Sequence, residues 1–148
     1  NLPFWMTAGW GYYVEHRIFR LCRVHYIDFK TYYANEKADF KRGATLGPNE
    51  DWPGPLKKMC KKDIRETLDT VCKAQILTLT PNQSGYIFAL AYFLVGNDEN
   101  IAKYRKLVER ARQGGTITKS VLLDTYGYED DAALEADWYE FMESRDFK

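Results

Sequence analysis

The chain opens on a stretch in which small residues alternate with large aromatic ones, Leu2-Pro3-Phe4-Trp5-Met6-Thr7-Ala8-Gly9-Trp10-Gly11-Tyr12-Tyr13-Val14-Glu15. Proline suits the first turn of a helix, because the N–H that it lacks would have no intrahelical partner there. Glycine costs a helix about 1 kcal/mol relative to alanine. A helix that keeps Gly9 and Gly11 is therefore expected to have something packed close against that face. We expect the packed structure to begin with this helix, without a leader segment in front of it.

Composition bounds the class of protein. A length of 148 residues fits one domain, and a hydrophobic content of 45% argues for a globular chain. Lys and Arg number 21 against 21 Asp and Glu, so no net field attracts nucleic acid or an anionic membrane. No apolar run reaches the roughly 18 to 20 residues of a membrane span. We therefore predict one domain over residues 1–148, with no nucleic-acid partner and no transmembrane segment.

Helical spacing of apolar residues continues beyond Glu15, and it predicts that the first helix runs to about residue 29. Residues 43–55 are rich in Gly and Pro and predict a flexible loop, which Trp52 would anchor to the body of the domain. A basic helix over 56–62 and a helix over 64–74 capped by Asp63 are expected next. The segment 75–79 is too short to assign by its period, and either the end of that helix or an extended segment fits.

The second half carries clear helix boundaries. Thr80 and Pro81 predict a helix start, and the following helix, to about residue 95, is apolar almost all round, which places it in the core. Further helices are expected over 99–113, after Thr116 or Thr118 as far as Tyr126, and after Asp130 or Asp131. With no convincing strand, the sequence predicts an all-α helical bundle.

The first stretch resembles the segment Pro-x-Trp-Leu-x-Glu-Gly-x-Ala-x-Tyr that follows the zinc-binding helix of gluzincin (peptidase-MA-like) metallopeptidases. The residues on or near that pattern are Pro3, Trp5, Met6, Gly9, Gly11, Tyr13 and Glu15. In that family an earlier H-E-x-x-H helix supplies two zinc ligands and a general base, and the Glu before the Gly is the third ligand. The matching position here is Ala8, whose methyl group cannot bind zinc, and the 148 residues contain no H-E-x-x-H.

The second half resembles the same family. Three features carry this resemblance, in the same order as in the family. They are an apolar helix from Tyr86 to Leu94, the run Lys103-Tyr104-Arg105, and a closing pattern of Gly127, Leu134, Glu135, Trp138 and Phe141. The resemblance covers residues 1–15 and about 84–142, whereas about 30–80 match nothing in it. It implies the C-terminal helical part of a gluzincin-like protein.

Candidate chemical groups are few. His16 and His25 are nine residues apart, so on one helix they would point to opposite sides and could not share a metal; we expect structural or solvent-exposed histidines. Glu15 lies about 10 Å along a helix from Ala8, too far to replace the missing ligand, and an ion pair with arginine is its expected role.

The three cysteines are Cys22, Cys60 and Cys72. They lack C-x-x-C spacing, and their odd number allows at most one disulfide within the chain, so we expect them to be small buried hydrophobes. A basic cluster is expected to be a solvated helix face: Lys57, Lys58, Lys61, Lys62 and Arg65.

Two functions follow. The first is a degenerate, non-catalytic metallopeptidase-like domain that acts as a binding or assembly module for a protein or peptide, without a cofactor in this chain. The alternative is the C-terminal part of an active zinc peptidase whose H-E-x-x-H helix lies upstream of residue 1, in which a zinc-activated water attacks the peptide carbonyl. The Trp and Tyr residues near the start are expected chiefly in the core. The candidates for lining the groove in which a gluzincin would hold a peptide are Trp5, Trp10, Tyr13 and Glu15.

Overall fold

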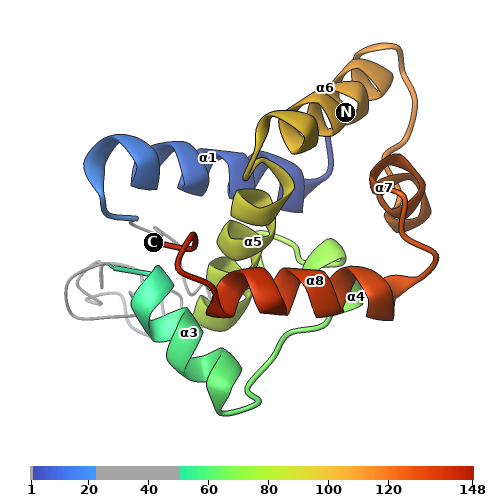
Figure 1. The fold of residues 1–148 in the computed structure, drawn as a ribbon. Coiled ribbons are helices and arrows are strands. Elements are labelled where there is room, and N and C mark those ends of the chain that lie inside the picture. Colours follow the sequence, from blue (N-terminus) through green and yellow to red (C-terminus); the bar gives the residue numbers. More distant parts are fainter. Residues whose placement is uncertain (1, 23–50) are drawn as a thin grey trace.

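The computed structural model describes residues 2–22 and 51–148, and this part of the chain holds seven helices and no strand. The predicted all-α class is therefore confirmed. The helices are α1 (Phe4–Phe19), α3 (Pro53–Lys61), α4 (Leu68–Cys72), α5 (Pro81–Leu94), α6 (Asp98–Arg112), α7 (Lys119–Tyr126) and α8 (Asp131–Glu143) (Figure 1).

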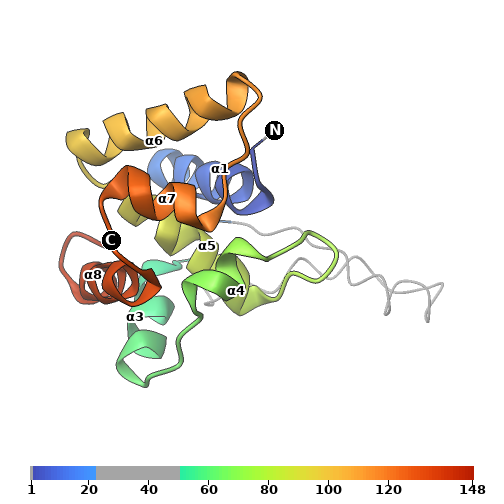
Figure 2. The ribbon, with the colours of Figure 1, turned by 90° about the vertical axis from the view of Figure 1, so that its right-hand side faces the viewer.

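Helix α5 is the centre of the packing, as its apolar sequence predicts. Ten of its fourteen residues are buried, and Figure 2 shows α6 and α1 at one end of the molecule, α3 and α8 at the other, and α5 between them. The start of α5 is a capping box. Thr80 Oγ accepts from the backbone N–H of Gln83 at 3.1 Å, and the Gln83 side chain accepts from that of Thr80 at 3.0 Å.

The crossing of α1 over α5 depends on Gly9. A Cβ atom at Gly9 would lie 2.9 Å from the Ala91 Cβ and 2.9 Å from the Ile87 carbonyl oxygen, closer than real Cβ atoms approach. Glycine thus lets the two helix backbones meet. At Gly11 an added Cβ would meet no atom within 4 Å. The prediction of a closely packed neighbour is therefore confirmed for Gly9 and wrong for Gly11.

Local capping chemistry sets most of the remaining helix boundaries where the sequence predicts them. Side chains of Asn97, Thr118 and Asp130 cap α6, α7 and α8. Gly127 follows α7 with a φ of 83°, the left-handed conformation that glycine adopts without strain.

The first helix is shorter than predicted. It ends at Phe19, because Arg20 adopts a left-handed conformation with φ of 59° and its N–H closes the last turn onto the His16 carbonyl. Residues 23–29 of the expected helix lie outside the described residues.

The expected loop over 43–55 is also corrected at its end. Helix α3 already begins at Pro53, and residues 43–50 lie outside the described part of the chain. Trp52 is fully buried and packs edge-on against Phe88, with ring centroids 5.5 Å apart, so its anchoring role is confirmed.

The helix predicted over 64–74 is wrong in its first half. Asp63 has a φ of 57° and does not cap a helix, the chain stays non-helical as far as Thr67, and Ile64 is half exposed rather than inward. Distant side chains bind this backbone instead: the Tyr86 hydroxyl donates to the Ile64 carbonyl, and the Tyr139 hydroxyl donates to that of Glu66. Residues 76–78 form a turn, which is neither of the two alternatives for this segment.

Candidate functional site

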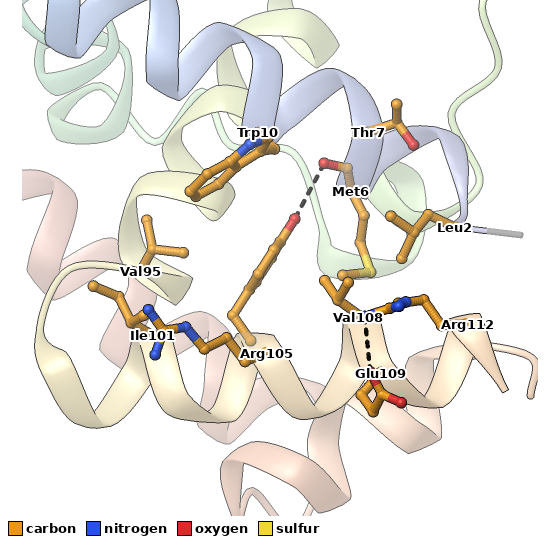
Figure 3. Close-up of a pocket in the computed structure, with 11 residues that line it drawn as sticks. Leu2, Met6, Thr7, Trp10, Val95, Ile101, Arg105, Val108, Glu109 and Arg112 are labelled. Carbon is orange, nitrogen blue, oxygen red and sulfur yellow. Dashed lines mark hydrogen bonds and ion pairs between the residues drawn. The ribbon is translucent and has the colours of Figure 1, made fainter.

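A groove of about 690 Å³ lies between α1 and α6 (Figure 3). Its lining is mostly apolar, with charged groups contributed by α6. The lining residues are Leu2, Met6, Thr7, Trp10, Val95, Ile101, Tyr104, Arg105, Val108, Glu109 and Arg112. Trp10 is 46% exposed and Leu2 is 38% exposed, so large apolar side chains stay accessible to a partner.

Tyr104 spans the space between the two helices. The tyrosine is buried, and its hydroxyl donates to the Met6 carbonyl of α1 at 3.2 Å. The Trp10 ring stacks on it, with centroids 5.8 Å apart and planes inclined by 25°. Burial also raises the pKa of the Tyr104 hydroxyl, so the group is a neutral hydrogen-bond donor. Tyr104 therefore fixes α6 beside α1 and forms part of the groove wall.

The α6 side of the groove is a stripe of residues spaced by four, three and four positions, which places them on one helix face. In order these are Ile101, Arg105, Val108 and Arg112, an alternation of apolar and cationic side chains. Arg112 forms an exposed ion pair with Glu109 at 3.4 Å, whereas Arg105 makes no ion pair with any residue that the structure describes. Residues 2–14 carry no charged side chain, so α6 alone gives the rim its charge of two cations against one anion.

The structure does not bring the four predicted groove residues together. Trp5 is buried in the core, and Trp10 alone lines the groove. Tyr13 lies behind Trp10, with ring centroids 5.7 Å apart, and packs edge-on against Tyr92. Glu15 lies seven positions beyond Ala8, where its Oε2 is 3.8 Å from the Cys22 sulfur.

Sequence reasoning missed the α6 wall. Ile101, Tyr104 and Val108 are at the helical spacing that predicts a core face, yet Ile101 and Val108 are only half buried and face the groove. A signal was present in the sequence. Arg105 and Arg112 fall on the same face as these apolar residues, at a spacing of seven, which is unusual for a helix face that is covered.

The residues that the structure describes do not fit a zinc ion. Ala8 is half buried against the hydrophobic core and offers only a methyl group. Within residues 2–22 and 51–148, no three His, Cys, Asp or Glu side chains come together as ligands.

His16 is a structural histidine. It is 3% exposed and packs edge-on against Phe88, with ring centroids 5.1 Å apart, and its Nδ1 has no hydrogen-bond partner among residues 2–22 and 51–148. Burial lowers its pKa; the charges of Arg20 and Arg17 act in the same direction, while that of Asp51 opposes them. The solvent-exposed alternative is wrong for this histidine, and His25 lies outside the described residues.

The three cysteines form no disulfide, so the single bridge that the sequence allowed is not formed. Cys22 and Cys60 are buried and Cys72 is half buried. Burial raises the pKa of Cys60 to about 11 and that of Cys72 to about 12. At neutral pH these two sulfurs are protonated and poor nucleophiles.

Part of the basic cluster has a structural role. Lys57 donates to the Ser144 carbonyl at 2.7 Å, and the Arg65 guanidinium lies 4.7 Å from the centre of the Tyr139 ring. The other three cations of the cluster are exposed, as Arg65 also is; they are Lys58, Lys61 and Lys62. Two of the five cations therefore help to hold α8.

None of the described helices is both long enough and apolar enough to cross a membrane. Comparison of the chain with protein-family models, with curated proteins and with solved structures finds no match.

Proposed function

We propose that this domain is a degenerate metallopeptidase-like helical module that binds a protein or peptide segment in the groove between α1 and α6. The observation that carries the proposal is the groove itself, because it keeps the half-exposed Trp10 beside an apolar floor of Met6, Ile101 and Val108. Tryptophan beside apolar side chains is the composition of the energetic centre of binding surfaces.

The resemblance to the C-terminal subdomain of gluzincins is part of this proposal. Two observations support it. The two segments that carry the resemblance pack on each other, through Gly9 against Ala91 and through the Tyr104 hydroxyl on Met6. The residues Leu134 and Trp138 of the closing motif are fully buried, so they hold the same core. Ala8 in place of a third zinc ligand favours a module without chemistry over an enzyme.

The alternative is an active zinc peptidase whose H-E-x-x-H helix precedes residue 1. The observation in its favour is the retained pattern from Pro3 to Tyr13. It requires a third ligand other than Ala8, whose methyl group cannot bind zinc.

Binding in the groove can be tested with an uncharged amphipathic peptide. We would use an 18-residue helical peptide of Leu, Ala and Gln, with Leu at positions i, i+4, i+7 and i+11, and follow the tryptophan indole signals by NMR, assigned with Trp10→Phe. The proposal predicts a saturable shift of the Trp10 signal and none of the buried Trp138 signal. A Trp10 signal that stays unchanged at millimolar peptide would contradict it.

The alternative is tested by zinc content, measured by elemental analysis on the longest natural form of the protein beside its Ala8→Glu variant. Zinc in neither form, or only in the Ala8→Glu variant, agrees with a module that has no working site. Stoichiometric zinc in the natural form would favour the peptidase.

A further inference from the structure

We propose that the segment bound in the α1/α6 groove is an amphipathic helix with acidic residues, whose carboxylates pair with Arg105 and Arg112. This inference rests on the proposed binding function and adds the chemistry of the partner.

The positive charges on the groove rim favour a partner that carries negative charge. Arg105 and Arg112 are exposed, lie seven residues apart on one face of α6, and are separated along α6 by about 10 Å. Glu109 offsets only one of them, and no acidic residue in residues 2–14 opposes them from α1. A carboxylate can pair with the unengaged Arg105 without breaking an existing ion pair, and a guanidinium binds a carboxylate through two parallel hydrogen bonds.

The shape of the groove selects a helix. Its α6 wall runs from Ile101 to Arg112, which is about 16 Å of helix, or three turns. Its α1 wall consists of Met6, Thr7 and Trp10 on the helix and Leu2 just before it. The floor between two neighbouring helices accepts a third that lays its apolar residues at i, i+4 and i+7 into the seam. On such a helix, residues seven apart also lie on one face and are separated by about 10 Å, the spacing of the two arginines.

The experiment compares three versions of the 18-residue peptide, with Gln, Glu or Lys at the positions that flank its leucine stripe. Fluorescence anisotropy of the labelled peptides measures each affinity for the complete 148-residue chain at low salt. We expect the Glu peptide to bind about tenfold more tightly than the Lys peptide, with the Gln peptide between them, and the gap to narrow as salt screens the charges.

Variants on α6 locate the effect. Arg105→Glu should reverse the order of the Glu and Lys peptides. Arg110→Glu makes the same charge change on the same helix at an exposed position outside the groove, so the order should stay as in the wild type.

The outcomes separate the two proposals. Equal binding of all three peptides, or an order that Arg110→Glu changes as much as Arg105→Glu does, would overturn the acidic partner and leave the groove as a binding site. Absence of binding by all three peptides would overturn both.

Discussion

Helix α1 has two flanks that differ in how they meet their neighbours. On one flank it touches α5 so closely that Gly9 leaves no room for a methyl group. On the other it faces α6 across a groove in which Trp10 is 46% exposed. The close packing on the first flank stabilises the fold. The second flank keeps apolar side chains in contact with water, and the hydrophobic effect that drives folding does not favour such exposure. This difference is why we place the proposed binding surface on the second flank.

The largest loss of stability is expected from a substitution of Phe88, a residue of α5 in the packed core. Its ring is fully buried and contacts the rings of His16, Trp52, Tyr92 and Phe147. Phe88→Ala should lower the free energy of unfolding by about 3–5 kcal/mol through lost burial and the cavity left behind. Urea denaturation measures this. Trp10→Ala, which removes a larger but half-exposed ring, is the matched comparison and should cost about 2 kcal/mol, because only about half of that ring is buried. Equal losses would remove the distinction between the flanks.

The two glycines of α1 give the next largest difference. Gly9→Ala should destabilise the protein by about 1–3 kcal/mol, because the new methyl group overlaps Ala91 and the Ile87 carbonyl. Gly11→Ala meets no atom within 4 Å and should stabilise the helix by roughly 0.5–1 kcal/mol. Thermal unfolding of the two variants measures whether each substitution lowers or raises the stability. A Gly9→Ala protein as stable as Gly11→Ala would show that the α1/α5 crossing is not close.

Tyr104→Phe tests the link across the groove. It removes the hydroxyl that donates to the Met6 carbonyl and keeps the ring under Trp10. We expect a loss of about 0.5–1.5 kcal/mol, the usual net value of one hydrogen bond, together with faster hydrogen exchange of amides in the α6 turn around Tyr104. Exchange that is unchanged would mean that the hydroxyl does not hold α6 to α1.

The smallest effect is a pH dependence on the packed flank. The folded-state pKa of His16 is lowered, first by burial, so folding favours the neutral ring. This contribution to stability is full above the unfolded pKa of about 6.5 and is lost as the pH falls through the lower folded value. Urea denaturation at about pH 7.5 and pH 5.5 should therefore show a larger acid loss in wild type than in His16→Phe. The same loss in both proteins would contradict the assignment.

How far the sequence predicts this structure depends on whether the cause is local. The caps at Thr80, Asn97 and Asp130 and the glycine after α7 act within one turn, so helix boundaries there follow from the sequence. Helix α4 also begins at a local cap, because the Thr67 hydroxyl accepts from the Thr70 N–H at 3.2 Å. What the sequence does not show is the non-helical backbone before Thr67, which the hydroxyls of Tyr86 and Tyr139 bind from distant helices.

The candidate site was less predictable than the fold for the same reason. Trp5 and Trp10 are only five residues apart on one helix, yet Trp10 lines the α1/α6 groove and Trp5 faces the core. The distance at which α6 lies from α1 depends on tertiary packing and on the Tyr104 hydroxyl, and neither appears in the spacing of apolar residues.

The measurement that tests the central claim most directly compares the affinity of the Gln peptide for wild type and Trp10→Ala, with the unfolding free energy of both proteins measured in parallel. We predict an affinity loss of at least about tenfold, the scale of an aromatic binding anchor, in a variant that stays folded with its stability lowered by about 2 kcal/mol. An unchanged affinity in a stably folded Trp10→Ala protein would contradict the claim that this flank of α1 is the binding surface.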